Sequence, residues 1–126
     1  MKLRGIITDY NNYDESAMVI LFPFCTFYDD GYDQFEYLLN KPIIDMTYNE
    51  IIDKYINDSA TQIIVFRGLE PFDSPKDICE LIKAFRLKTN DEIIIYTRYT
   101  EEESAWYIKY FKDWHIKNIN IKFLWI

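Results

Sequence analysis

The stretch AMVILFPF, residues 17–24, is apolar throughout and indicates the fold class of this chain. A strand with one buried face alternates apolar and polar residues, whereas an unbroken apolar run is typical of a strand covered on both faces. The runs TQIIVF (residues 61–66) and EIIIYT (residues 92–97) have the same character. INIKFLWI (residues 119–126) predicts a last strand and LRGIITDY (residues 3–10) a first one. Strands of this kind favour a parallel sheet.

Signals for helices lie between these strands. TYNE, at residues 47–50, is a capping box that predicts a helix from Thr47 to about Asp58. Ser74 with Pro75 after it predicts the start of a second helix. TEEE, at residues 100–103, predicts a third helix that ends near His115. Alternating strands and helices predict one α/β domain of 126 residues, with a parallel sheet and outer helices.

The composition favours a globular protein that does not bind nucleic acid directly. Hydrophobic residues make up 49% of the chain, a proportion typical of a folded core. The net charge of −7 argues against nucleic-acid binding, which needs clustered Lys and Arg to neutralise phosphates. No apolar run approaches the roughly 20 residues of a membrane helix, and there are only two cysteines. We therefore expect a cytoplasmic protein without a membrane segment or disulfides.

The charge is distributed unevenly. No Lys or Arg occurs from Gly5 to Asn40, and this segment holds seven acidic residues: Asp9, Asp14, Glu15, Asp29, Asp30, Asp33 and Glu36. Such a run is either an ordinary solvated face or a surface that meets a basic partner. Its DDGYD stretch lacks the alternate spacing of an EF-hand loop, so we expect no metal site there.

Three stretches resemble a known family. They are RGIITDYNNYDESAMVILFPFCTF (residues 4–27), VFRGLEPFDS (residues 65–74) and IIIYTRYTEEE (residues 93–103). In this order they resemble the small radical-SAM proteins related to the anaerobic ribonucleotide reductase activating enzyme. The resemblance implies an incomplete radical-SAM-type (β/α) barrel. It also implies a [4Fe–4S] cluster on three cysteines, with S-adenosylmethionine held by the fourth iron and by the loop that contains Glu70.

The cluster motif is largely missing from this chain. Cys25 matches the first cluster cysteine, but Asp29 and Tyr32 stand where the family pattern C-x3-C-x2-C has the other two. No thiol occurs from residue 26 to residue 78, and Cys79 lies in the second predicted helix, where a structural role is expected. A [4Fe–4S] cluster normally needs Cys ligands at several irons. We therefore expect neither the cluster nor S-adenosylmethionine as a cofactor.

Two arginines replace glycines of the family pattern. Arg67-Gly68 stands in place of a glycine pair, and Arg98 stands in place of the glycine of the turn after the next strand. One interpretation is an Arg–Asp cluster that fills the vacated cofactor site, with Arg67 and Arg98 facing Asp29, Asp30, Asp33 or Glu70. In a second, both arginines point to solvent. In a third, they line a pocket for an anion such as a nucleotide phosphate.

The third predicted helix carries two aromatic stripes. Trp106, Tyr110 and Trp114 form one, and Tyr107, Ile108 and Phe111 form the other, so the apolar arc covers more than half of the helix. Either the chain end, residues 124–126, covers the surplus, or one stripe contacts a second copy or another protein. Trp and Tyr often carry interface energy.

Two classes of function follow from these features. The first is a degenerate, non-catalytic radical-SAM-like protein that binds another macromolecule as an inhibitor, adaptor or regulator. By analogy of charge and size alone, an acidic domain of this kind resembles some phage anti-defence inhibitors. The alternative is an enzyme of the radical-SAM type, or a cleft that binds S-adenosylmethionine or another nucleotide-like anion. His115, the only histidine, has no companion in the sequence for catalysis.

Overall fold

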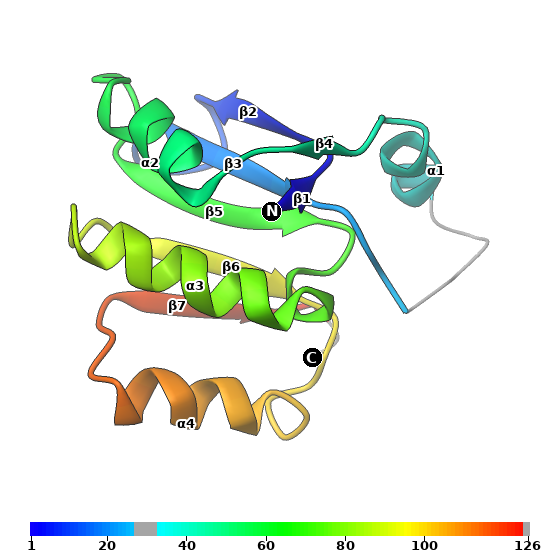
Figure 1. Ribbon diagram of the computed structural model, residues 1–126. Helices are drawn as coiled ribbons and strands as arrows, with labels where there is room; N and C mark the ends of the chain where they lie inside the picture. The colour runs from blue at the N-terminus through cyan, green and yellow to red at the C-terminus, as the bar shows by residue number, and fades with distance from the viewer. Residues whose placement is uncertain (27–32, 125–126) are drawn as a thin grey trace.

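The computed structural model describes residues 1–26 and 33–124, and for residues 33–35 the backbone alone (Figure 1). Its strands are β1 (Lys2–Leu3), β2 (Gly5–Asp9), β3 (Ala17–Phe22), β4 (Ile44–Asp45), β5 (Ile63–Gly68), β6 (Ile93–Thr97) and β7 (Ile119–Phe123). Its helices are α1 (Asp33–Leu39), α2 (Tyr48–Ile56), α3 (Pro75–Arg86) and α4 (Ala105–Asp113), with a 3-10 turn η1 (Pro71–Asp73). The predicted α/β class is confirmed.

A five-stranded sheet of order β2-β3-β5-β6-β7 forms the centre of the fold. Its last four strands are parallel, as predicted for the apolar runs. β2 instead runs antiparallel to β3, with Gly5 opposite Leu21 and Asp9 opposite Ala17. Only residues 10–16 join these two strands, which is too short for the crossover that a parallel pair needs. The first predicted strand is also divided, because β1 pairs with β4 in a separate two-stranded sheet.

The two faces of the five-stranded sheet differ in what covers them. All six residues of β3 are buried, and alternate residues point to opposite faces. The even-numbered residues of β3 belong to the main core, together with buried residues of α2, α3 and α4. These three helices therefore cover one face of the sheet (Figure 1). The odd-numbered residues of β3 lie on the other face, where Leu38 of α1 packs beside a smaller apolar cluster.

The helix starts follow the predicted signals with one exception. Thr47 and Glu50 make both hydrogen bonds of the capping box, 3.1 Å and 3.0 Å long, and Pro75 opens α3. Thr100 and Glu103 also exchange two such bonds, but on a turn that precedes the helix. α4 begins only at Ala105, so its predicted start at residue 100 is wrong. Within residues 1–26 and 33–124, no helix is both long and apolar enough to cross a membrane.

The segment between β3 and α2 contains two elements that were not predicted, α1 and β4. The guanidinium of Arg4 joins this segment to the sheet. Its Nε donates to the carbonyl of Pro23 at 3.0 Å, and its Nη1 donates to the carbonyls of Leu39 at 3.0 Å and Lys41 at 2.7 Å. The side chain of Arg4 thus holds the end of α1 next to the end of β3.

Candidate functional site

The loops that follow β3, β5 and β6 meet at one edge of the sheet, where parallel α/β folds carry their functional residues (Figure 1). A hydrogen-bond network joins one residue from each loop. Asp73 Oδ2 accepts the main-chain N–H of Thr26 at 2.6 Å, and Asp73 Oδ1 accepts the hydroxyl of Tyr99 at 2.5 Å. The hydroxyls of Thr26 and Tyr99 lie 3.3 Å apart. The three loops therefore converge at the carboxyl ends of these strands.

Glu70 lies at the centre of this edge with no exposed surface. Its Oε2 accepts the hydroxyl of Thr97 at 2.7 Å and the main-chain N–H of Phe72 at 3.1 Å, and its Oε1 accepts the main-chain N–H of Arg98 at 2.7 Å. Burial raises the pKa of the Glu70 carboxyl above its ordinary value, and the three hydrogen bonds oppose that rise. Both oxygens of Glu70 thus tie the loop after β5 to the end of β6.

Gly68 allows β5 to pass close to β3. Its φ is +89°, and a Cβ at this position would lie 2.3 Å from the main-chain nitrogen of Phe22. Beyond it, the N–H of Leu69 donates to the carbonyl of Phe22 at 3.0 Å, and the N–H of Glu70 donates to the carbonyl of Phe24 at 2.9 Å. In the family pattern, Gly68 belongs to the glycine pair of the cofactor loop. The close neighbour in the structure is the backbone of β3 itself.

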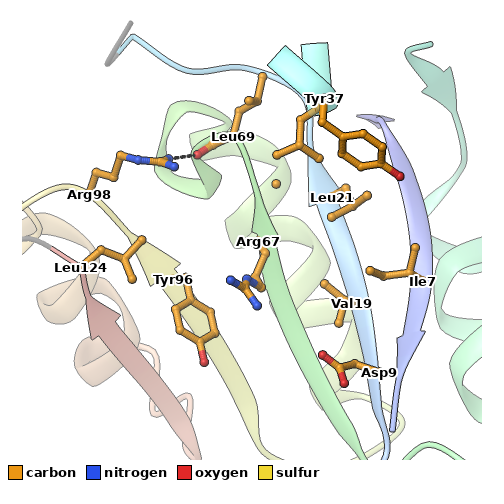
Figure 2. A pocket seen from close by; sticks show the side chains of 12 residues that line it. Ile7, Asp9, Val19, Leu21, Tyr37, Arg67, Leu69, Tyr96, Arg98 and Leu124 are labelled. Carbon is orange, nitrogen blue, oxygen red and sulfur yellow. Dashed lines mark hydrogen bonds between the residues drawn. The ribbon is translucent and has the colours of Figure 1, made fainter. Parts of the chain in front are cut away.

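Arg67, in β5, and Arg98, the first residue after β6, lie at neighbouring strand ends, but they make different contacts (Figure 2). The guanidinium of Arg98 donates to the carbonyl of Leu69. The guanidinium carbon of Arg67 lies 4.7 Å from the centre of the Tyr96 ring, in a cation–π contact. Arg67 is half-buried, so the interpretation in which it simply points to solvent does not describe it.

The predicted Arg–Asp cluster involves residues that the structure describes only in part. Asp29 and Asp30 lie outside the described residues, and for Asp33 only the backbone is described. Of the predicted acidic partners, Glu70 is described in full, and it binds the main-chain N–H of Arg98. The cluster with Asp29, Asp30 and Asp33 stays a prediction.

A cleft of about 500 Å³ opens on the sheet face that α2, α3 and α4 do not cover (Figure 2). Its lining residues come from β2, β3, α1, β5 and the end of β6, and they include Asp9, Val19, Leu21, Tyr37, Arg67 and Arg98. Val19 and Leu21 of β3 are apolar, and Arg67 stands opposite Leu21 on β5, in the middle of the labelled residues (Figure 2). Arg98 lies apart from it, beside Leu69 (Figure 2). The cleft therefore combines apolar surface with positive charge.

The thiols of this chain do not fit a [4Fe–4S] cluster. There are two cysteines in the whole sequence, and Cys79 is 6% exposed within α3, where it belongs to the main core. Burial raises the pKa of the Cys79 thiol, as expected for a structural cysteine. Cys25 is half-buried at the loop after β3, and a single thiolate cannot supply ligands to several irons.

The two aromatic stripes of α4 have different surroundings. Phe111 is buried, and the ring of Tyr107 stacks on Phe72 with centres 4.0 Å apart. Trp106 and Trp114 are 60% and 62% exposed. Tyr110 lies between these two, with ring centres 5.3 Å from Trp106 and 6.0 Å from Trp114. We call Trp106, Tyr110 and Trp114 the aromatic ladder.

In the alternative to an exposed stripe, the chain end, residues 124–126, covers the aromatic ladder. Leu124, the last described residue, is itself 51% exposed and lines the cleft on the opposite side of the sheet from α4. Residues 125–126 lie outside the described part of the chain. Within the described residues, the two tryptophans of the ladder remain largely open to solvent.

Comparison with protein-family models, with curated proteins and with solved structures finds no match to this chain. The relationship to radical-SAM proteins thus rests on the resemblance of the three sequence stretches and remains a proposal.

The residues that hold the strand ends together were not predicted. Thr26, Asp73 and Tyr99 lie in the loops after β3, β5 and β6, but nothing in their spacing marks them as hydrogen-bond partners. The signal that could have identified them was their position directly after neighbouring parallel strands. A Thr, an Asp and a Tyr that follow three neighbouring strands are within reach of one another at that edge.

Proposed function

We propose that this chain is a non-catalytic binding protein built on an incomplete radical-SAM-type barrel, and that it acts by contact with another protein. The strand order supports the barrel relationship. β3, β5, β6 and β7 follow one another in space in the order of the sequence, and α2, α3 and α4, which precede β5, β6 and β7, lie on one face. Doubly wound sheets reverse direction and carry helices on both faces, whereas barrels continue in one direction.

The contacts at the strand ends support the absence of catalysis. Glu70, which the resemblance assigns to the cofactor, uses both oxygens for hydrogen bonds within the protein. Asp73 is likewise bound by Thr26 and Tyr99. Glu70 has no exposed surface, so a substrate does not reach its carboxylate in this conformation.

The observation that carries the binding role is the exposure of the aromatic ladder. Two tryptophans on one helix face lie largely in solvent, although Trp is a residue type that proteins usually bury in large part. Trp and Tyr are enriched among the residues that dominate binding energy at protein interfaces. Lys83 of α3 lies 5.3 Å from the centre of the Trp114 ring, so a charged residue borders the ladder at one end. An apolar centre with a charged border is the usual anatomy of an interface.

The test compares three forms of the chain as bait in affinity capture from cells of its native host. They are the wild type, the double variant Trp106→Ala with Tyr110→Ala, and Leu87→Ala, which removes another highly exposed apolar side chain. We expect a protein that the wild type and Leu87→Ala retain and that the double variant retains at least tenfold less. The same difference should appear with that protein in purified form.

Two other outcomes would contradict the assignment. Equal retention by all three forms would remove the ladder from the interface. A double variant that fails to fold, by its circular dichroism, would place the rings in the core and return the search to the acidic segment between Asp9 and Glu36. Sedimentation of the wild type alone shows whether the partner is a second copy, as in a homodimer.

A further inference from the structure

The cleft on the uncovered sheet face is separate from the aromatic ladder and has its own chemistry. It lies above β3 and β5, whereas the ladder lies on α4, beyond the opposite face (Figures 1 and 2). Val19 and Leu21 form an apolar floor, and Arg67 and Tyr96 rise from the neighbouring strands. A cleft of about 500 Å³ is in the range of small-molecule sites, which combine apolar walls with a few polar groups.

Arg67 is the principal charged group in this cleft. Its guanidinium carbon lies 4.7 Å from the centre of the Tyr96 ring, in a cation–π contact. Within the described residues, Arg67 forms no ion pair with a carboxylate. A half-buried guanidinium that is fixed in orientation by an aromatic ring is well placed to bind an anion.

Asp9 is the acidic residue that lines the same cleft, and its carboxylate accepts hydrogen bonds from Asn11 and Asn12. Asp9 Oδ1 accepts the main-chain N–H groups of Asn11 and Asn12 at 3.0 Å and 3.2 Å, and its Oδ2 accepts the amide of Asn12 at 2.8 Å. These bonds lower the pKa of Asp9 and hold its carboxylate in the turn after β2. The positive charge of Arg67 also contributes to the lowered pKa, but less than the turn does.

One further cation lines the cleft, and another contacts the ring of a lining residue. Arg98 lines it from the end of β6, where the carbonyl of Leu69 holds its guanidinium (Figure 2). Lys41 places its ammonium 5.3 Å from the centre of the Tyr37 ring, and Tyr37, at 66% exposure, lines the cleft from α1. The cleft thus gathers positive charge on a protein whose net charge is −7.

We propose that this cleft binds a small organic phosphate with a planar ring, of the nucleoside monophosphate class. The phosphate binds the guanidinium of Arg67, because a guanidinium matches two phosphate oxygens at once. The ring lies on the apolar floor toward Tyr37, whose exposed ring offers a stacking surface. This inference does not depend on the role of the aromatic ladder, since the two sites lie on different elements.

The experiment titrates the ¹⁵N-labelled chain with AMP, GMP, CMP and UMP, and compares adenosine, inorganic phosphate and S-adenosylmethionine. We expect one or more of the monophosphates to shift the amides of Val19, Leu21 and Tyr96 and to leave those of α4 unchanged. Adenosine lacks the phosphate and inorganic phosphate lacks the ring, so each should bind at least tenfold more weakly. S-adenosylmethionine carries a sulfonium cation and should also bind at least tenfold more weakly.

Two variants test the role of the guanidinium. Arg67→Met keeps a long side chain without charge and should weaken binding of the monophosphate at least tenfold. Lys88→Gln removes one positive charge from an exposed residue after α3 and should leave the affinity unchanged. If Arg67→Met does not fold, the amide shifts of the wild-type chain with each monophosphate test whether the ligand binds in the cleft. Absence of binding by all four monophosphates, shifts outside the cleft, or equal affinity of Arg67→Met would overturn the proposal, as would equal affinity for inorganic phosphate.

Discussion

The main-chain N–H of Arg98 lies 2.7 Å from Oε1 of Glu70, so the loop after β5 binds the first residue after β6. Thr97 and Phe72 donate to the other oxygen of the same carboxylate. The glutamate that the family resemblance assigns to a cofactor therefore connects two strand ends of this protein. Removal of the Glu70 carboxylate should therefore lower the free energy of unfolding.

Replacement of Glu70 by Gln should destabilise the protein by about 1–3 kcal/mol. A Gln side chain accepts hydrogen bonds through one oxygen only, so at least one of the three donors loses its partner. Urea denaturation measures the free energy of unfolding. Glu102→Gln makes the same chemical change at an exposed residue and should stay within about 0.5 kcal/mol of the wild type. Equal effects of the two changes would show that the three hydrogen bonds of the Glu70 carboxylate do not stabilise the fold.

The pH dependence of stability should differ between the wild type and Glu70→Gln. Burial raises the pKa of Glu70 in the folded protein above the ordinary value of 4.5, so the folded state takes up the proton first as the pH falls. The contribution of Glu70 to stability is therefore fully present below pH 4.5 and decreases as the pH rises through the raised pKa.

Unfolding free energies of both forms, measured near pH 4.5 and at neutral pH, check this sign. The wild type should gain stability relative to Glu70→Gln at the lower pH. Other carboxyl groups titrate equally in both forms and cancel in the difference. A relative gain at neutral pH would mean that the three hydrogen bonds outweigh the cost of burial.

Gly68→Ala should destabilise the protein much more than Gly5→Ala. Both glycines have positive φ, but a Cβ at Gly5 would meet only Leu21 Cδ1 at 3.8 Å, whereas at Gly68 it would overlap the backbone of Phe22. The strained φ alone costs about 1–3 kcal/mol, and the overlap adds to that at Gly68. Thermal or urea unfolding of both variants gives the comparison. Similar losses at the two positions would mean that β3 and β5 separate easily.

Neighbouring residues of α4 should differ sharply in their effect on stability. Tyr107 stacks on Phe72 and donates its hydroxyl to the carbonyl of Phe72 at 3.0 Å, so Tyr107→Ala should cost about 3 kcal/mol. Trp106 is largely exposed, so Trp106→Ala should cost less than about 1 kcal/mol. Denaturation midpoints with unchanged m-values report both. A large cost at Trp106 would place the ladder in the core.

Much of the fold could be predicted because the central strands are apolar runs, α2 begins at a capping box and α3 begins at a proline. The hydroxyl of Ser74, the predicted cap of α3, makes no capping hydrogen bond. The unpredicted helix α1 begins at Asp33 and has only seven residues. Phe35, Leu38 and Leu39 stand at helical spacing, but no capping box precedes them. The start of α4 was misplaced because the bonds between Thr100 and Glu103 are those of a capping box but close an isolated turn. A local signal identifies hydrogen bonds, and tertiary packing decides where the helix begins.

The sequence predicted where the residues of the candidate site lie, but it did not predict most of their contacts. Parallel strands bring their carboxyl ends together, which is sufficient to place Glu70, Arg67 and Arg98 at one edge. That Arg67 stacks on Tyr96 depends on the register between β5 and β6, in which Phe66 lies opposite Ile95. No sequence pattern states this register. The same applies to Gly68, whose close neighbour is another strand and not a ligand.

The central claim is that this chain acts by binding and does not carry radical-SAM chemistry. The most direct test is reconstitution of the purified chain with ferrous iron and sulfide under anaerobic conditions, followed by measurement of bound iron and of the visible absorption spectrum. We predict iron far below the about four atoms per chain of a [4Fe–4S] cluster, no cluster absorption, and the same result for Cys25→Ser. About four irons per chain, together with reductive cleavage of S-adenosylmethionine, would contradict the account.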